Sequence, residues 1–129
     1  MRLLLDSHAL LWWYEGNRRL SPPARRALED TERNQVLVSA ASAWEIATKH
    51  RSGRLPKAEA LTRDIPGALA RAGFEELPVT VADGQRAGAL PGPLRDPFDR
   101  MLIAQAVSRD PLLVSDETLF DQYGVHRLW

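Results

Sequence analysis

Short apolar runs alternate with stretches of helical periodicity along the chain. Three runs of consecutive apolar residues are typical of strands that are buried on both faces, as in a parallel sheet. These runs are RLLL (2–5), QVLVSA (35–40) and PLLVSD (111–116). FEELPV (74–79) and VHRLW (125–129) predict two further strands, and the charges and the proline of the former favour the edge of a sheet.

Helices are predicted between these strands. One helix follows Asp6 directly, and SPPARRALED places a serine cap before the prolines that suit a helix start. A longer helix is expected to begin at Ser42 and to stop at Gly53, and two short helices are expected to be broken at Pro66. The remaining helices are expected within TVADGQRAGAL (80–90), DPFDRMLIAQAVSR (96–109) and ETLFDQYG (117–124). This alternation predicts an α/β fold with a mostly parallel central sheet that is covered on both faces.

The composition is that of an ordinary globular domain. The 129 residues are enough for one domain, residues 1–129, with a sizeable core, and 44% of them are hydrophobic and 26% charged. The chain has no cysteine, which excludes disulfides and thiolate metal sites. No apolar run approaches the roughly 20 residues that a membrane helix needs. We therefore expect a soluble, cytoplasmic protein.

The net charge is zero, from 17 Lys and Arg against 17 Asp and Glu. The chain as a whole therefore has no electrostatic attraction to nucleic acid, and any such binding has to come from local patches. Two basic segments are candidates, although each is also explained as a solvated helix face. They contain Arg18, Arg19, Arg25 and Arg26 in the first, and Lys49, His50, Arg51, Arg54 and Lys57 in the second.

Four acidic residues come from segments that are expected to meet at one edge of the sheet. Asp6 and Asp116 each follow a predicted strand directly, and Glu45 and Asp99 fall in the first turns of predicted helices. Parallel strands end, and the helices after them begin, at the same edge, so these side chains are expected to converge. Crowded like charges are destabilising unless a cation balances them, and oxygen ligands suit Mg²⁺ or Mn²⁺. The pattern indicates a metal-dependent phosphodiesterase.

Asp96 lies one residue before its helix and has a simpler explanation. An aspartate followed by Pro97 and, three positions on, by Asp99 is typical of a helix start with Asp96 as the N-cap. On this segment alone, capping explains both carboxylates. Convergence with the other acids favours metal binding for Asp99 and leaves Asp96 as the cap.

Four segments resemble PIN-domain ribonucleases, in particular the VapC-type toxins of bacterial toxin–antitoxin pairs. They are LLLDSHALLWW, VSAASAWEIATKHRSGRL, RDPFDRMLIAQA and LLVSDETLFDQYGV, in the order and spacing of that family. The resemblance implies a three-layer α/β/α sandwich, a negatively charged pocket for Mg²⁺, and RNA as the substrate. It also implies a homodimer and a cognate antitoxin as a protein partner. Transfer, ribosomal and messenger RNA are all open as substrates.

The resemblance also assigns roles to residues, with the four acids as the catalytic set. Asp6 and Asp99 would bind the metal, and Asp116 would act through water or on a second ion. Glu45 would orient or activate the attacking water. Supporting positions around these acids are Ser7, Asp96, Ser115 and Arg100. Arg100 is expected either to bind phosphate or to form a structural pair with a neighbouring acid.

Other residues are given structural roles. His8 is expected to be a buried or half-exposed helix residue rather than a ligand. Four aromatic residues are expected to serve core packing, a dimer contact or antitoxin docking: Trp12, Trp13, Tyr14 and Trp44.

Two rival functions are inconsistent with the residues that follow the first predicted strand. Asp6-Ser7-His8 lacks the acidic pair of a two-component receiver and the Asp-x-Asp of a haloacid-dehalogenase-type phosphatase. The alternative that stays open is a non-catalytic PIN-like module whose acidic pocket seats a basic partner peptide.

Overall fold

A five-stranded sheet in the order β3-β2-β1-β4-β5 forms the centre of the computed structural model, which describes residues 1–129. Every pair of neighbouring strands is parallel. The strands are β1 (Arg2–Leu5), β2 (Gln35–Ser39), β3 (Glu75–Leu77), β4 (Leu112–Val114) and β5 (Arg127–Leu128). The predicted α/β class with a mostly parallel sheet is confirmed, and so is the edge position of β3.

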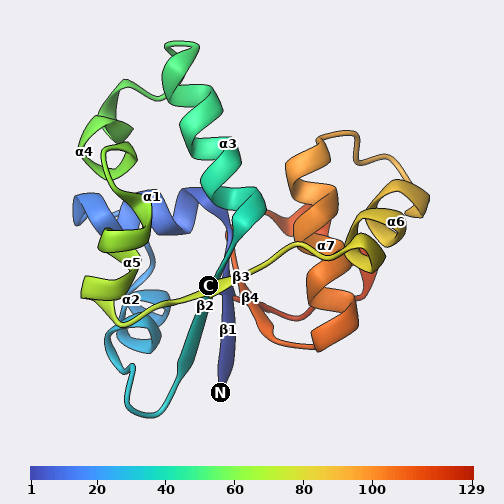
Figure 1. Ribbon diagram of the computed structural model, residues 1–129. Coiled ribbons are helices and arrows are strands. Elements are labelled where there is room, and N and C mark those ends of the chain that lie inside the picture. The colour runs from blue at the N-terminus through green and yellow to red at the C-terminus, as the bar shows by residue number, and fades with distance from the viewer.

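Helices cover both faces of the sheet and complete a three-layer α/β/α sandwich (Figure 1). The helices α1, α2, α4 and α5 lie on one side of the sheet, α6 and α7 lie on the other, and α3 begins where β2 ends. The α-helices are α1 (Ser7–Glu15), α2 (Pro22–Glu29), α3 (Ala40–Arg51), α4 (Glu59–Thr62), α5 (Ile65–Ala72), α6 (Val81–Ala89) and α7 (Pro97–Arg109), and the 3₁₀ helices are η1 (Pro56–Ala58) and η2 (Thr118–Tyr123). None of these helices combines the length and the apolar character needed to cross a membrane.

The central strand β1 contributes to two separate hydrophobic cores. Successive side chains of a strand point to opposite faces of the sheet. Leu3 and Leu5 accordingly pack with the layer of α1, α2, α4 and α5, whereas Leu4 packs with the layer that contains α7. All three side chains are fully buried. Both helical layers therefore depend on the same four-residue strand.

The helix after β2 begins earlier than predicted. Ser39, not Ser42, is the N-cap of α3, because the Ser39 hydroxyl accepts a backbone hydrogen bond in the first turn (3.1 Å). Ser42 is buried inside the helix, and its hydroxyl has no hydrogen-bond partner. The helix ends at Arg51, and Gly53 follows shortly afterwards with a φ of 80°. With no loop between β2 and α3, Glu45 is held close to the edge of the sheet.

Three further boundaries differ from the prediction. The break between α4 and α5 lies at Arg63 and Asp64 rather than at Pro66, because Asp64 caps α5 and a proline is well tolerated in a first helical turn. The segment ETLFDQYG forms the 3₁₀ helix η2 instead of an α-helix, as is common for a short connector. The last strand is limited to Arg127–Leu128.

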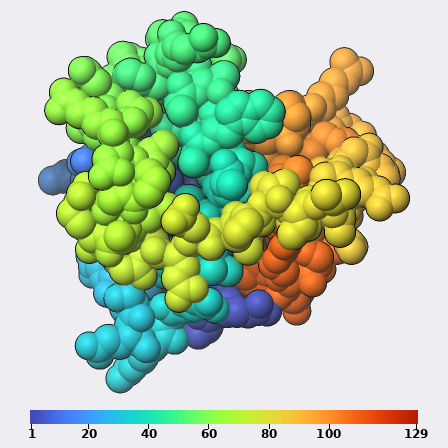
Figure 2. Space-filling model, viewed as in Figure 1, coloured from blue at the N-terminus to red at the C-terminus, as the bar shows by residue number.

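A buried ion pair fastens α6 to α7. Asp83, in the first turn of α6, accepts two hydrogen bonds of 2.9 Å from the guanidinium of Arg109 at the end of α7. These hydrogen bonds hold the pKa of Asp83 well below its usual range. Gln105 also donates to Asp83 (3.2 Å), and Thr80 completes a capping box with it. The pair anchors α6 at the end of the segment that crosses the front of the molecule after β3 (Figure 2).

We expect Asp83→Asn to lower the free energy of unfolding by about 2 kcal/mol at neutral pH, because Arg109 loses its buried partner. Folding lowers the pKa of Asp83, so its stabilising contribution is complete above the ordinary carboxyl pKa of about 4 and is lost as the pH falls below it. The difference from the wild type is therefore expected to shrink in acid. Urea denaturation at neutral pH and at about pH 3 measures this difference.

Glu59→Gln is the matched control, since it removes an exposed ion pair with Arg63. Its expected effect is below about 0.5 kcal/mol at either pH. Equal destabilisation by the two substitutions would contradict a special role for the Asp83–Arg109 pair.

Candidate active site at the carboxyl edge of the sheet

A pocket of about 330 Å³ opens at the edge of the sheet where β1 and β4 end and α3 and α7 begin. The four acids that were expected to converge all line it: Asp6, Glu45, Asp99 and Asp116. We call it the acidic pocket. Its other lining residues include His8, Trp12, Arg19, Lys49, Asp96 and Glu117. The predicted convergence is confirmed, and the roles of the four acids in catalysis and metal binding stay predictions.

The strands β1 and β4 and the helix α1 together fix the position of Asp6. It directly follows β1, and its backbone N–H donates to the carbonyl of Val114 in β4 (3.1 Å). One of its carboxylate oxygens caps α1 by accepting from the N–H of Ala9 (2.7 Å). Burial raises the pKa of Asp6, and a hydrogen bond from the Ser115 side chain opposes that rise. Asp6 thus brings a buried carboxylate to the pocket, and the supporting role expected of Ser115 stays a prediction.

Glu45 is almost completely buried, at 4% exposure, in the second turn of α3. Its Oε1 atom accepts a hydrogen bond from the Ser7 hydroxyl (2.5 Å), which confirms a supporting contact for Ser7. Its Oε2 atom accepts from the ammonium group of Lys49, one turn further along the helix. From the sequence, Lys49 was predicted only as a member of a basic segment, and its pairing with Glu45 was not predicted. The signal was available, because residues four apart on a helix face each other.

Asp99, like Asp6, carries a strongly perturbed carboxyl group. Burial raises the pKa of Asp99 to about 7. The negative charges of Asp96, Glu45 and Asp6 act in the same direction, and the positive charge of Lys49 opposes them. The pocket therefore crowds carboxylates more than its own cations compensate.

Asp96 caps α7, as predicted. One of its carboxylate oxygens accepts hydrogen bonds from the backbone N–H groups of Phe98 (2.8 Å) and Asp99 (3.1 Å). This cap fixes the first turn of α7 and therefore the position from which Asp99 enters the pocket. The two aspartates of RDPFDR thus have different surroundings: Asp96 is hydrogen-bonded to its own helix, and Asp99 lies among the acids of the pocket.

Asp116 lies at the exposed rim of the pocket, two residues after β4. Its negative charge contributes to the raised pKa of Asp6. The neighbouring Ser115 is buried, and its hydroxyl accepts a hydrogen bond from the backbone N–H of Glu117 (3.0 Å). The chain after β4 is thereby turned so that Asp116 and Glu117 both line the pocket.

Residues 3–125 match the family model of the PIN domain. The chain belongs to the PIN domain family. Ribonuclease VapC16 of Mycobacterium tuberculosis is 44% identical over 54 residues, a match that covers 42% of this PIN domain and 38% of VapC16. The matched region is thus well under half of that relative's length.

Two solved structures share the fold of this PIN domain. VapBC2 from Rickettsia felis, bound to a DNA fragment from its promoter, has a TM-score of 0.72 at 15% identity and covers 100% of this chain and 98% of its own. The sarcin–ricin loop cleaving toxin VapC20 of Mycobacterium tuberculosis has a TM-score of 0.67 at 15% identity, with 98% of both chains covered. These likenesses confirm the predicted three-layer, PIN-like architecture.

The donor atoms of the acidic pocket suit a hard divalent cation. They are carboxylate oxygens, the ligands that Mg²⁺ and Mn²⁺ prefer. Burial first, and neighbouring negative charges second, raise the pKa values of Asp6 and Asp99, and a bound cation would favour the charged form of both groups. No three His, Asp or Glu side chains are arranged as a ready-made metal site. Mg²⁺ commonly keeps several of its waters and binds through one or two carboxylates, so the pocket fits such an ion without a closed cage of ligands.

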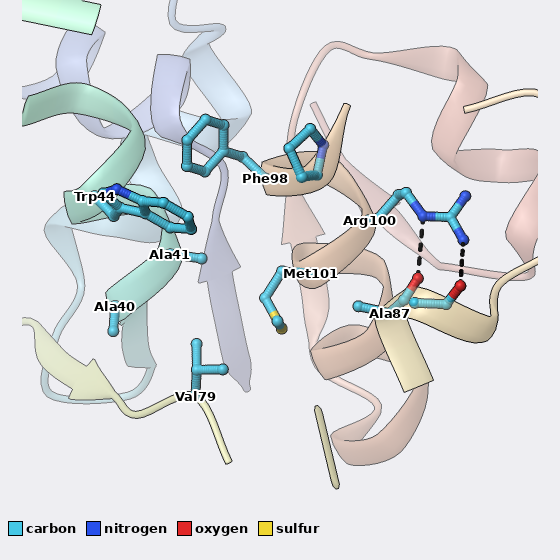
Figure 3. A pocket seen from close by; sticks show the side chains of 10 residues that line it. Ala40, Ala41, Trp44, Val79, Ala87, Phe98, Arg100 and Met101 are labelled. Atoms are coloured by element: carbon cyan, nitrogen blue, oxygen red, sulfur yellow. Dashed lines mark hydrogen bonds between the residues drawn. The ribbon is translucent and has the colours of Figure 1, made fainter. Parts of the chain in front are cut away.

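Arg100 of the PIN domain has a different role from both expected ones. Its guanidinium donates to the backbone carbonyls of Ala87 (3.0 Å) and Leu94 (2.8 Å), and also to those of Gly88 and Leu90. Figure 3 shows the guanidinium directed toward Ala87. The last carbonyls of a helix lack partners within it, and Arg100 supplies partners to those at the end of α6. The expectations of a phosphate ligand or an acidic partner are therefore wrong.

His8 also differs from its expectation. Its side chain is exposed rather than buried or half-buried, and it lines the acidic pocket. The positive charge that it can carry acts to lower the pKa of Asp6. Because α1 begins at the edge of the sheet, its second residue faces the same opening as the acids.

The aromatic residues of the PIN domain divide into buried and exposed groups. Trp12 packs in the core against Trp129, with ring centroids 5.8 Å apart, and Trp13 packs against Phe74 at 5.6 Å. Core packing, one of the roles expected for these residues, is thus confirmed for Trp12 and Trp13. Tyr14 and Trp44 are instead exposed.

Trp44 belongs to a second hollow, of about 390 Å³, between the first turns of α3 and α7. It is 65% exposed and meets Phe98 edge-on at 4.9 Å. Figure 3 shows the residues of both helices that face one another across this hollow. We call it the apolar groove, and its apolar lining includes Ala40, Ala41, Trp44, Val79, Phe98 and Met101.

We expect Asp99→Asn to stabilise the fold in metal-free buffer by about 1 kcal/mol at pH 8, with allowance for the solvent that screens this half-buried carboxyl. Folding raises the pKa of Asp99 to about 7. The folded state therefore holds the proton more tightly than the unfolded state, and the wild type loses stability as the pH rises from about 4 through 7. The variant lacks this loss, so its advantage is expected to grow over that interval. Urea denaturation in EDTA across the interval measures it.

Glu32→Gln is the control, because it removes an exposed carboxylate that has no ion-pair partner. We expect it to leave the pH dependence of stability unchanged. A large loss of stability in Asp99→Asn under these conditions would mean that Asp99 is a structural residue.

Proposed function

We propose that this PIN domain is a metal-dependent endoribonuclease and the toxin of a toxin–antitoxin pair. The observation that carries the proposal is the convergence of Asp6, Glu45, Asp99 and Asp116 in one pocket. Four carboxylates from separate segments are destabilising on their own, and their crowding is explained by the binding of a cation. The partial match to ribonuclease VapC16 supports RNA as the substrate.

Two carboxylates, those of Asp6 and Asp99, would bind Mg²⁺ or Mn²⁺, and Asp116 would act through water or on a second ion. When bound, the ion stabilises the negative charge that develops on the scissile phosphodiester and makes water a better nucleophile. The rest of the site is supplied by groups that keep these acids in position. Ser115 donates to Asp6, and the cap formed by Asp96 fixes the helical turn that carries Asp99.

Glu45 orients the attacking water and accepts its proton. Ser7 and Lys49 hold its two carboxylate oxygens, and a carboxylate has about four lone-pair positions, so room for a water remains on each oxygen. The ion pair with Lys49 also fixes the position of the Glu45 carboxylate, which a general base needs in order to reach the water. The reaction is a hydrolysis by water in a single displacement, without a covalent enzyme intermediate.

Total cellular RNA incubated with Mg²⁺ is expected to give discrete new fragments with the wild type. Asp99→Asn is expected to reduce cleavage at least about 100-fold, because it removes an anionic metal ligand. Electrophoresis and mapping of the fragment ends measure cleavage and identify the RNA. Glu32→Gln, an exposed substitution outside the pocket, is expected to cleave like the wild type.

A melting experiment without RNA separates the nuclease from the binding module. Mg²⁺ or Mn²⁺ is expected to raise the melting temperature of the wild type but not that of Asp99→Asn. Folded wild-type protein that neither cleaves RNA nor gains stability from either ion would instead support a module whose acidic pocket seats a basic peptide.

Two protein partners belong to this proposal. The antitoxin places a cationic side chain among the carboxylates of the acidic pocket, where an arginine can bind a carboxylate through two parallel hydrogen bonds. The toxin–antitoxin complexes among proteins of this fold, VapBC2 of Rickettsia felis and a complex from Klebsiella pneumoniae at a TM-score of 0.56 and 16% identity, are compatible with such a partner. The second partner is another copy of this chain, packed on the apolar groove.

Self-association through the apolar groove is expected to be lost in Trp44→Glu, because exposed apolar patches of this kind mark protein contacts and burying an unpaired charge there is unfavourable. Size-exclusion chromatography with light scattering is expected to give a dimer for the wild type and a monomer for the variant. Tyr14→Glu, at an aromatic residue of α1 that is 43% exposed and lies outside the groove, is the control and is expected to stay dimeric. A monomeric wild type, or a dimeric Trp44→Glu, would contradict the assignment.

A further inference from the structure

A groove of about 340 Å³ adjoins the acidic pocket. Its walls are α1 and the chain that follows it on one side, and the connection from α3 with the start of η1 on the other. Three residues line both hollows, namely His8, Trp12 and Arg19. The two hollows therefore adjoin each other along these residues, so a linear ligand that lies across them can reach both. We call the second hollow the basic groove.

The basic groove gathers cations from two distant parts of the chain. Arg19 comes from the first basic segment, and Arg54 and Lys57 come from the second. Other members of those segments lie elsewhere: Arg18 and Arg51 line neither hollow. The fold thus places three of the nine residues of the basic segments in this groove and a fourth, Lys49, in the acidic pocket, on a chain whose net charge is zero.

These three cations have no carboxylate partner. The ion pairs of the chain are formed by Arg33, Lys49, Arg63, Arg109 and Arg127. Arg19 lies over the Trp12 ring, 5.9 Å from its centroid, a contact that positions a guanidinium without using its N–H donors. Arg54 donates one hydrogen bond to the hydroxyl of Ser52 (3.0 Å). Glu15 is the one acid among the lining residues, so the groove keeps an excess of positive charge.

The acidic pocket by itself repels the substrate that the proposed function requires. A phosphodiester chain carries one negative charge per nucleotide, and five aspartates and glutamates other than Glu45 line that pocket. Cations beside the pocket offset this repulsion and lower the free energy of the bound strand. A groove of this size accommodates one strand rather than a double helix, and an exposed ring such as that of His8 at the junction can stack on an unpaired base.

We propose that the basic groove binds the backbone phosphates of a single-stranded RNA segment that flanks the scissile bond, with Arg19, Arg54 and Lys57 as the phosphate ligands. This inference rests on the proposed ribonuclease function and assigns the path of its substrate. The three cations position the strand and take no part in the bond that is broken. Their loss therefore weakens binding and leaves the chemical step intact.

Binding is tested in the Asp99→Asn protein in EDTA, where no cleavage occurs, with a short fluorescent oligouridylate and fluorescence anisotropy. The double substitution Arg54→Ala/Lys57→Ala is expected to weaken binding at least about 10-fold. It is also expected to reduce the slope of log affinity against log salt by about 0.7 for each phosphate that the protein ceases to neutralise. Arg18→Ala/Arg51→Ala is the matched control, since it removes the same charge, one residue from each basic segment, at exposed positions outside the groove. It is expected to retain both the affinity and the slope of the parent protein.

Cleavage by otherwise wild-type protein with Mg²⁺ gives the second readout. Arg54→Ala/Lys57→Ala is expected to raise KM at least about 10-fold with kcat within about threefold, because binding and not chemistry is affected. Circular dichroism confirms that the variants are folded.

The outcomes separate the two proposals. Cleavage by the wild type with equal KM for the groove and control variants would overturn the groove and leave the ribonuclease standing. Absence of cleavage, together with oligouridylate binding that depends on Arg54 and Lys57, would overturn the ribonuclease and support the groove as an RNA site. Duplex RNA that binds as tightly as the single strand and with the same sensitivity to Arg54→Ala/Lys57→Ala would overturn its assignment to single strands.

Discussion

The parallel pairing of β1 with both β2 and β4 is the constraint on which the rest of this structure depends. Leu4 is paired with Leu37 on one side and with Leu113 on the other, so the three strands end at one edge of the sheet. Asp6 follows β1, Asp116 follows β4 by two residues, and α3 begins directly after β2. Antiparallel pairing would have sent these ends to opposite edges. The meeting of acids that are up to 110 residues apart is thus a consequence of backbone hydrogen bonding in the sheet.

That meeting has an electrostatic cost, which the chain offsets at each carboxylate in a different way. The carboxylate of Asp6 is stabilised by the first turn of α1 and by the Ser115 side chain. That of Asp96 accepts backbone hydrogen bonds as the cap of α7. That of Glu45 forms an ion pair with Lys49. The side chain of Asp99 has no hydrogen-bond or ion-pair partner of its own, and its pKa rises to about 7 although the charge of Lys49 opposes the rise. Because the compensation is incomplete at Asp99, the pocket keeps an affinity for positive charge, which a metal ion or a cationic side chain of a partner can satisfy.

A buried acid in the opposite layer of the sandwich is paired with a cation and has a structural role. Asp83 is also a buried acid, but the guanidinium of Arg109 neutralises it fully and the pKa of Asp83 falls instead of rising. Arg100 likewise uses its donors on backbone carbonyls at the end of α6. These groups use most of their hydrogen-bonding capacity within the fold. A charged residue is thus a candidate for binding when the fold leaves it uncompensated, as with Asp99 in the acidic pocket and Arg54 in the basic groove.

The α/β class, the parallel sheet, the cap at Asp96 and the convergence of the four acids all followed from local pattern, because strand runs and helix starts are encoded over a few neighbouring residues. The pairing of Lys49 with Glu45 was also within reach of the sequence through its helical spacing. Predictions from neighbouring residues were wrong where more than one residue, or more than one kind of partner, suited the local sequence equally well. Ser39 and Ser42 could both cap α3, and Arg100 could bind phosphate, acid or carbonyl. Only the tertiary structure decided these cases, and only it joined Arg19 to Arg54 and Lys57, because contacts between distant segments depend on how the layers pack and not on the residues beside them in the chain.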